Sequence, residues 1–509
     1  MTINLDAGTP AAPAAPAMSG ARRSFVAWLA LAGLFVVAIW FRHVLAANTD
    51  LSWLLTAGER VLDGGRLYVD VIETNPPMSV LAYLPAIVIS RTTGLTAETV
   101  VDALVFAAIF ASLACCSLLL RRSGNLVGAR GWPLVLFAFA ILAILPAQTF
   151  GQREHIAVIA LLPMLAVLIA RIAESAPPRW LAMAAGLGAA VTLAFKPHFA
   201  LAVYVPLAVV GVVTRLSWRV LLLPEHLAAA AGGILYVSIT AIHWPQFFTE
   251  ILPLLRDVYV PVKPPLTALL EKPAISLWAI ALLAIMALQR GRQLAPPLIL
   301  LMAASAAFAV AFLLQGKGWP YQSYPAIALA LFALGYALTR DDRTSRLWRF
   351  GAGVLLLALF VRSMLWFDTA FDARPLQQRV AQLGLKRPAI LAITAEPGIG
   401  HPLTRAVGGT WVSRQQGLWI DTYLTVMRRS GMLDDVRAAA FETYAERERQ
   451  RLIEDVRRTP PTILLVDDLT GGASDWLTAH PDVAALLTDF QKVDTVNNVG
   501  IFTGRASGG

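Results

Sequence analysis

Long apolar runs separated by short polar segments dominate the first 366 positions of the chain. Each run is roughly 18 to 24 residues long, the length that an α-helix needs to cross a bilayer. The pattern predicts a polytopic α-helical membrane protein with about 11 transmembrane helices. The predicted spans lie near residues 24–41, 98–120, 132–149, 155–172, 180–197, 199–214, 219–242, 274–290, 296–314, 322–339 and 349–366.

Arginines gather in every second connection between these runs. Cytoplasmic loops of membrane proteins are enriched in Lys and Arg, so the alternation predicts a cytoplasmic N-terminus and a C-terminal domain on the outer side. The Ala/Pro-rich residues 1–23 are predicted to be a disordered cytoplasmic tail. The outer loops are then 42–97, 150–154, 243–273 and 315–321. The basic clusters are Arg22/Arg23, Arg121/Arg122/Arg130, Arg171/Arg179, Arg215/Arg219, Arg290/Arg292 and Arg340/Arg343/Arg346/Arg349.

The loop at 42–97 contains two further helical patterns. Apolar positions at helical spacing predict an amphipathic helix over 51–63, which Gly64-Gly65 would end and after which Pro76-Pro77 would start the next helix. Residues 78–90 are apolar, but they are short for a span and Pro85 interrupts them. We interpret them as a juxtamembrane or re-entrant helix, because a span here would move every later arginine cluster to the outside.

The last part of the chain, 367–509, has the pattern of a soluble α/β domain. PAILAIT (388–394) and TILLVDD (462–468) are short buried-strand patterns, and 431–458 is a charged helical stretch. Residues 492–505 suggest a closing hairpin. The domain contains no P-loop, dinucleotide fingerprint, zinc-ligand spacing or serine-hydrolase elbow.

Composition supports this division of the chain. The sequence is 57% hydrophobic and only 15% charged, whereas a soluble domain carries about 25% charged residues. The net charge of +9 comes from the membrane part, so it does not indicate a nucleic-acid partner. The only two cysteines, Cys115 and Cys116, are adjacent in one apolar run and cannot join distant elements.

Asp50 is the first candidate for chemistry. It stands just outside the first predicted span, where a partly desolvated carboxylate could act as a general base towards an acceptor hydroxyl. The alternative is structural, because Asp50 is also well placed to cap the 51–63 helix.

Three other polar clusters fall on the same predicted side of the membrane. In FGQREH, the charged Arg153 and Glu154 either face a water-filled cavity or pair with each other. Lys196, in FKPHF, is either a phosphate partner or a lysine that reaches the interface. Lys317, in QGKGWPYQSYP, lies either in a ligand loop or in an aromatic belt around a turn. One outer cleft could gather these groups around an anionic lipid-linked ligand.

These residues and their order resemble the GT-C glycosyltransferases, in particular the bacterial branch that includes lipid A aminoarabinose and galacturonic acid transferases and protein mannosyltransferases. The resemblance covers the membrane part. It rests on Asp50, the second outer loop with Glu154, the late Lys-Gly-x-x-Tyr loop, and the run formed by Gly65, Tyr68, Asp70, Asn75, Pro76 and Pro77.

The resemblance implies an enzyme of the bacterial inner membrane that transfers a sugar from a polyprenyl-phosphate or pyrophosphate donor on the periplasmic face. Asp50 would be the general base or orienting acid, Glu154 the second-loop acid, and Lys196, Lys317 and Arg153 the partners of the leaving phosphate. The family's second loop often carries an aspartate or paired acids. Here a single Glu stands between Arg and His, so a divalent cation stays an open question. The remaining cleft residues would be Tyr68, Asp70, Glu73, His155, His198, Trp319 and Tyr321.

Two other classes share parts of this pattern. A transporter or flippase of lipid-linked sugar would also need many spans, but the chain shows no clear internal repeat and its charges gather at one membrane face rather than mid-span. A scaffold protein would place its function in 367–509, where no recognisable site occurs. The sugar, the acceptor (a membrane lipid, a glycan or a protein) and the oligomeric state are not specified by the sequence.

Overall fold

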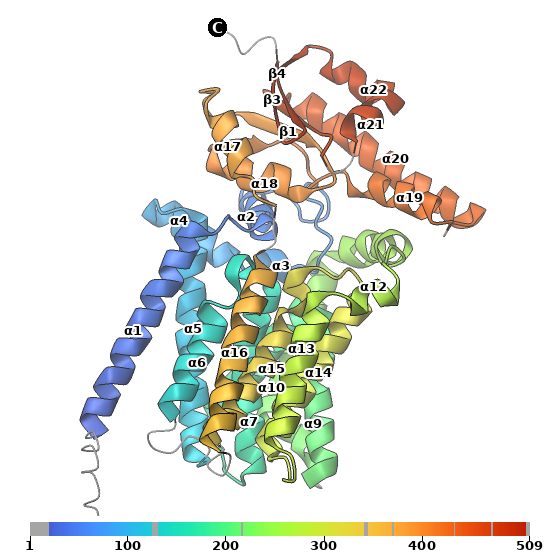
Figure 1. Ribbon diagram of the computed structural model, residues 1–509. Coiled ribbons are helices and arrows are strands. Elements are labelled where there is room, and N and C mark those ends of the chain that lie inside the picture. Colours follow the sequence, from blue (N-terminus) through green and yellow to red (C-terminus); the bar gives the residue numbers. More distant parts are fainter. Residues whose placement is uncertain are drawn as a thin grey trace, which may run out of the picture.

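The computed structural model describes residues 20–124, 131–214, 217–340, 345–368, 371–431, 433–469 and 472–504. Figure 1 shows a bundle of long helices, a layer of short helices across one end of it, and an α/β domain on top of that layer. The first helix begins at Gly20, inside the predicted tail; residues 1–19 of that tail lie outside the described residues. Three arginines of the predicted basic clusters, Arg130, Arg215 and Arg343, also lie outside the described residues.

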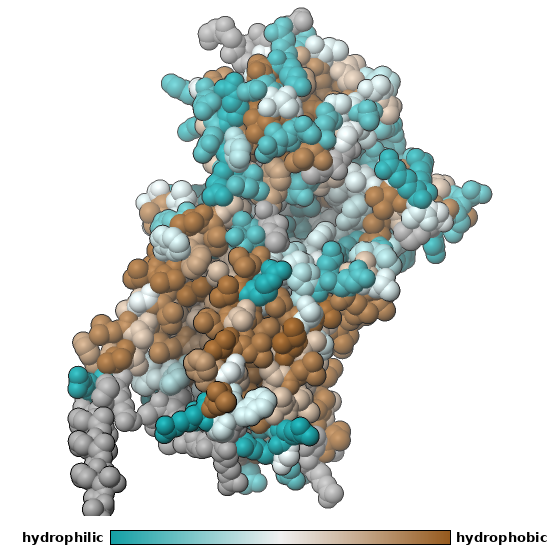
Figure 2. All heavy atoms as spheres, viewed as in Figure 1, coloured by the Kyte–Doolittle hydropathy of each residue, from teal (hydrophilic) through white to brown (hydrophobic). Residues whose placement is uncertain are grey.

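The bundle is built from apolar helices that alternate in direction along the chain (Figure 1). In Figure 2 their outer surface is largely hydrophobic, with hydrophilic residues at the end away from the α/β domain. The helices are α1 (Gly20–Val44), α5 (Ala97–Arg122), α6 (Gly131–Ala143), α7 (Arg153–Ile172), α8 (Arg179–Phe195), α9 (Ala200–Thr214), α10 (Pro224–His243), α13 (Pro273–Leu288), α14 (Pro296–Gln315), α15 (Pro320–Arg340) and α16 (Arg346–Phe367).

Within the described residues, seven helices are long and apolar enough to cross a membrane: α1, α5, α7, α10, α14, α15 and α16. Shorter apolar helices, α6, α8, α9 and α13 among them, run beside these seven. The chain is a multi-pass membrane protein, whereas the prediction of about 11 spans remains a prediction. One predicted span is too long: 132–149 breaks after Ala143, and Pro146 precedes a 3-10 turn at Ala147–Thr149.

Residues 78–90, predicted to form one juxtamembrane or re-entrant helix, are instead divided between two short helices in the layer across the end of the bundle. The segment forms α3 (Met78–Leu81) and α4 (Leu84–Thr93), with Pro85 in the first turn of α4. The amphipathic helix α2 runs from Thr49 to Leu62. Between α10 and α13 lie two π-helical turns, Phe247–Ile251 and Leu255–Tyr259, with α11 (Leu252–Leu254) between them and α12 (Leu266–Leu270) after them.

The alternative prediction that Asp50 caps the helix at 51–63 is wrong. The cap of α2 is Asn48, whose side chain accepts a hydrogen bond from the backbone N–H of Leu51 at 2.9 Å. Asp50 lies one position inside the helix, in its first turn, so its carboxylate does not cap the helix and remains available to other groups.

The C-terminal domain has the predicted α/β character. Its sheet has the order β2-β1-β3-β5-β4, with β1 parallel to β2 and β3, and β5 antiparallel to β3 and β4. The predicted hairpin is confirmed, with Asn497 and Asn498 in the left-handed conformation that a tight two-residue turn requires. The elements are α17 (Arg374–Ala381), β1 (Ala389–Ile393), α18 (Pro397–Ala406), β2 (Thr410–Trp411), α19 (Trp419–Arg429), α20 (Asp435–Arg458), β3 (Ile463–Asp467), α21 (Ala473–Ala479), α22 (Pro481–Ala484), β4 (Phe490–Val496) and β5 (Val499–Gly504).

Two arginines hold the C-terminal domain on helices α2 and α5. Arg60 of α2 donates hydrogen bonds to the carbonyl oxygens of Ser413, at 2.7 Å, and Trp411. Arg405 of α18 pairs with Glu59 at 2.8 Å and with Glu98 at 2.5 Å. These contacts place the domain directly above the helix that carries Asp50.

The C-terminal domain also contains a buried acid that makes its stability depend on pH. Glu448 of α20 accepts hydrogen bonds from the backbone N–H groups of Ile420 and Asp421, each at 3.3 Å, and burial raises the pKa of Glu448 to about 8. A carboxyl with a raised pKa binds its proton more tightly in the folded state. The stability that it contributes therefore declines as pH rises from about 4.5 to about 8.

We expect Glu448→Gln to remove this decline and to raise the free energy of unfolding at pH 8 by a few kcal/mol, because a rise of the pKa from 4.5 to about 8 corresponds to at most about 5 kcal/mol. Thermal unfolding of the purified protein at pH 5, 6.5 and 8 measures the effect, with the exposed Asp489→Asn as control. Equal pH profiles for wild type and Glu448→Gln would contradict the assignment.

The membrane topology can be tested with reporter fusions. In Figure 1 the last residues of α5 and the first residues of α6 lie at the end of the bundle opposite the C-terminal domain. A reporter at Gly128 should therefore report the cytoplasm and a reporter at Gly472 the periplasm, if the arginine clusters set the orientation. If both reporters lie on the same side of the membrane, the topology is wrong. If Gly128 reports the periplasm and Gly472 the cytoplasm, the helices span as described but the predicted orientation is wrong.

Candidate active site

A cleft of about 870 Å³ opens where the helix bundle, the layer of short helices and the C-terminal domain meet. Its walls come from the upper ends of bundle helices and from residues 48–76. Residues between 371 and 423 close it from above. The described structure thus gathers segments from most of the chain around one cavity at the end of the bundle.

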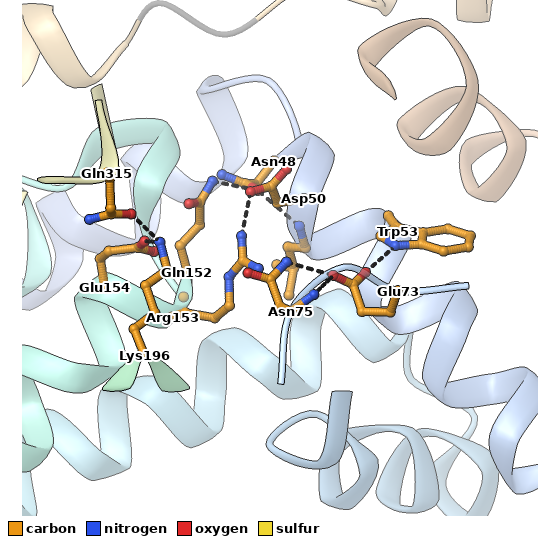
Figure 3. Close-up of polar contacts among 12 residues, drawn as sticks. Asn48, Asp50, Trp53, Glu73, Asn75, Gln152, Arg153, Glu154, Lys196 and Gln315 are labelled. Carbon is orange, nitrogen blue, oxygen red and sulfur yellow. Dashed lines mark hydrogen bonds and ion pairs between the residues drawn. The ribbon is translucent and has the colours of Figure 1, made fainter. Parts of the chain in front are cut away.

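Asp50 lines this cleft and forms an ion pair with Arg153, the first residue of α7. The distance from Asp50 Oδ2 to Arg153 Nη2 is 2.8 Å, and Figure 3 shows the two side chains facing each other at the centre of the site. Burial raises the pKa of Asp50, and the guanidinium of Arg153 opposes that shift. The Asp50 side chain keeps a quarter of its surface exposed, so a substrate can reach it.

Glu154 and Lys196 form a second ion pair beside the first. Lys196 Nζ lies 2.5 Å from Glu154 Oε1 and 2.6 Å from Gln315 Oε1, and Figure 3 shows the three side chains converging. Lys196 lines the cleft, whereas Glu154 is fully buried behind it. Glu154 therefore compensates the charge of Lys196 and does not itself face the cavity.

Glu73 lines the opposite end of the cleft and is fixed by three hydrogen bonds. It accepts from Trp53 Nε1 at 2.5 Å, from Asn75 N at 2.8 Å and from Asn75 Nδ2 at 2.5 Å. Figure 3 shows it on the far side of Asp50 from Lys196. The site is thus polarised, with a lysine at one end and an acid at the other.

The other cleft residues predicted from sequence divide into two groups. His198, Trp319 and Tyr321 line the cavity, and Lys196 Nζ lies 5.6 Å from the centre of the Tyr321 ring. The following side chains do not line it: Tyr68 donates to the Asn75 carbonyl at 2.7 Å, Asp70 pairs with the exposed Arg66 at 3.0 Å, and His155 bonds to the backbone of Gly151 and Leu142.

Lys317 is also turned away from the cavity. Its Nζ donates to the carbonyl oxygens of Tyr259, at 2.6 Å, and Val262, at 2.5 Å, and lies 3.9 Å from the centre of the Tyr259 ring. Gly316 and Gly318 on either side have positive φ, so the loop can turn the lysine inward. Burial lowers the pKa of Lys317 to about 7. In this conformation Lys317 stabilises the backbone of residues 259–262, which form part of the cleft wall, and does not face a ligand.

Several cleft residues were missed at the sequence level. Asn48 joins the cap of α2 to the second outer loop, because its side chain also bonds to Gln152 and to the carbonyl of Gln148. Lys263 adds a third cation to the lining. The sequence predicted that Lys263 lies in an outer loop, 243–273, but it did not select this lysine. No local pattern selected the lining residues from the C-terminal domain, which are Phe371, Ala395, Glu396, Pro397, Gln416, Trp419 and Tyr423.

Metal binding stays open. Among the described residues, no three His, Cys, Asp or Glu side chains converge in a way that could hold a metal ion. The two acids nearest the centre, Asp50 and Glu154, are each paired with a cation.

Comparison with known proteins identifies the fold. No protein-family model matches the sequence, and no curated protein is significantly similar to it. The structure is similar to ArnT from Cupriavidus metallidurans bound to undecaprenyl phosphate, with 13% identity, a TM-score of 0.57, and coverage of 96% of this chain and 98% of that chain. For apo ArnT the identity is 14%, the TM-score 0.58 and the coverage 96% and 99%.

A third similar structure is the arabinofuranosyltransferase AftD from Mycobacteria, with 13% identity, coverage of 96% of this chain and 40% of that chain, and a TM-score of 0.44, which is too low to support an argument. The resemblance to GT-C glycosyltransferases predicted from the outer loops is confirmed at the level of the fold. At such low identity, activity and substrate must be argued from the site itself.

Proposed function

We propose that this protein is a glycosyltransferase of the bacterial inner membrane that moves a sugar from a polyprenyl-phosphate or pyrophosphate donor to an envelope lipid, glycan or protein. The observation that carries the proposal is the polarised cleft at the end of the helix bundle, in which Asp50 and Arg153 form a partly accessible pair. A crystal structure of ArnT, which shares the fold, is of a complex with undecaprenyl phosphate.

The cations of the cleft suit a lipid phosphate. Arg153 and Lys196 line the cavity, Lys263 joins them, and Arg153 stands at the N-terminus of α7, where the helix dipole favours an anion. As the sugar–phosphate bond breaks, charge develops on the leaving phosphate. Fixed cations in a cleft of low dielectric stabilise that charge.

The ion pairs suggest how donor binding prepares the base. With no donor, Arg153 is occupied by Asp50 and Lys196 by Glu154. A phosphate that approaches Arg153 competes with Asp50 for the guanidinium and leaves the carboxylate freer to accept a proton. Asp50 then acts as general base on the acceptor hydroxyl, while the phosphate leaves with the electron pair of the broken bond.

The location of the charges supports the periplasmic face and disfavours the transporter. The cleft lies at the end of the bundle where α7 begins and α14 ends. The arginines of the connections at 121–122, 171–179 and 290–292 lie at the other end. A flippase would need charged groups along the path between both ends, and here they gather at one end.

Comparison of envelope material from cells with and without the protein tests the proposed function. Mass spectrometry of extracted glycolipids, glycans and glycoproteins should show one sugar missing from one acceptor in the deletion strain, and a lipid-linked form of that sugar should accumulate. Unchanged envelope glycans together with an unchanged pool of lipid-linked sugars would contradict the proposal.

A further inference from the structure

The C-terminal domain contributes polar groups to the cleft that have no side-chain partner among the described residues. Glu396 uses one carboxylate oxygen, Oε1, to accept a hydrogen bond from the backbone N–H of Gly398 at 2.9 Å. Among the described residues, its other oxygen and the side-chain amide of Gln416 have no hydrogen-bond partner. Both residues line the cavity and are half-buried. These groups are therefore ready to bind a ligand.

The position of Glu396 is fixed by its surroundings. Its backbone N–H donates to Thr394 Oγ1 at 2.9 Å, and that hydroxyl in turn donates to the buried Asp467 at 2.7 Å. A Cβ atom at Gly398 would lie 2.9 Å from Glu396 Oε1 and 2.9 Å from Phe371 Cβ, so only glycine fits beside the carboxylate. These contacts fix the orientation of the Glu396 carboxylate, so its free oxygen faces the cavity before a ligand binds.

An aromatic wall links these groups to the phosphate end of the cleft. The rings of Trp419 and Tyr423 lie 5.2 Å apart, and Tyr423 stacks on Tyr259 at 6.1 Å with an angle of 27°. The wall continues from Tyr259 to Trp319 at 6.3 Å and on to Tyr321 at 5.8 Å. The flat apolar faces of sugar rings pack on such side chains, while acids and amides bind their hydroxyls.

The charge of this end of the cleft indicates which acceptor group it receives. Burial raises the pKa of Glu396, and the nearby carboxylates of Asp50 and Asp467 add to the shift. Glu73 lies away from the lysine end (Figure 3), and its neighbour Ile72 pairs with Gln415, the residue before Gln416. Where they are ionised, the acids at this end repel a phosphate, and in either protonation state they accept hydrogen bonds from hydroxyl groups.

We propose that Glu396 and Gln416 of the C-terminal domain, together with the aromatic wall, form an acceptor subsite for a carbohydrate, and that the reacting group is a sugar hydroxyl rather than a phosphate or a protein side chain. This inference rests on the proposed function. It assigns the C-terminal domain to acceptor selection, and the bundle to the donor.

The experiment uses full-length protein and an acceptor extract. The donor is lipid-linked sugar extracted, with a metabolic label, from cells that lack the protein. The acceptor is an envelope extract of the same cells, divided into portions that are untreated, protease-digested, phosphatase-treated or oxidised with periodate, which cleaves vicinal diols of sugars. We expect transfer to survive protease and phosphatase and to be lost after periodate. Loss after protease or phosphatase would overturn the inference.

Two variants test the named residues. Glu396→Gln and Gln416→Ala should each raise the acceptor concentration for half-maximal rate about tenfold, change the maximal rate less than twofold, and leave binding of undecaprenyl phosphate unchanged. Asp489→Asn, an exposed acid on the same domain, is the control. Wild-type values for both variants would overturn the assignment although transfer itself occurs. If the wild-type protein transfers sugar to none of the extracts, the result contradicts the proposed function itself and with it the acceptor subsite.

Discussion

Asp50→Asn should reduce sugar transfer by about 10²- to 10⁴-fold, the usual contribution of a general base. The substitution keeps the size of the side chain and an oxygen that can accept from Arg153, but it removes the negative charge and the proton affinity. Helix α2 should persist, because Asn48 and not Asp50 provides its cap. The rate is measured as label transferred from lipid-linked sugar to the envelope extract.

Two further variants separate loss of the base from loss of structure. Asp63→Asn changes another acid at the end of α2, one that pairs with Arg91 at the exposed surface, and should leave the rate unchanged. Asp50→Glu keeps the charge next to Arg153 and should retain part of the activity. If Asp50→Asn transfers sugar within threefold of wild type, Asp50 is not the base.

Lys196→Met should weaken the binding of undecaprenyl phosphate by about 10- to 100-fold, because a hydrogen bond to a charged group contributes about 1.5–3 kcal/mol. Arginine at this position should restore binding only in part, since its planar fork differs from a compact ammonium. Binding to the purified full-length protein can be followed by native mass spectrometry or by the shift in thermal unfolding.

Loss of Lys196 also leaves Glu154 buried without its cation, which would destabilise the protein by itself. The double variant Glu154→Gln/Lys196→Met removes both charges and should recover stability but not phosphate binding. Lys386→Met, at an exposed position of the C-terminal domain, is the matched control. Full binding by the double variant would show that Lys196 has no part in holding the phosphate.

Local pattern predicted much of the fold because each element carries its own signal. The apolar runs located the bundle helices, the leucine spacing located α2, and the strand patterns located β1 and β3. The hairpin was also predicted, and its Asn497-Asn498 turn explains why that segment reverses. The short strand β2 was missed because two residues carry no detectable alternation.

The site was predicted less completely, because its partners come from distant parts of the chain. Local pattern left the partner of Arg153 open between the adjacent Glu154 and a cavity, whereas in the structure Arg153 pairs with Asp50, over 100 residues away. Lys317 was selected for its flanking glycines, which in fact turn it towards Tyr259. Glu396 has no local signal, since only the docking of the C-terminal domain brings it to the cleft.

The most direct test of the account is a reconstitution that separates transfer from transport. Purified full-length protein is placed in liposomes that contain labelled lipid-linked sugar, with acceptor extract outside. We predict that label appears on the acceptor, that free polyprenyl phosphate is released in equal amount, and that Asp50→Asn reduces both by about 10²- to 10⁴-fold. Movement of intact lipid-linked sugar across the bilayer, with no label on the acceptor and no phosphate released, would contradict the account.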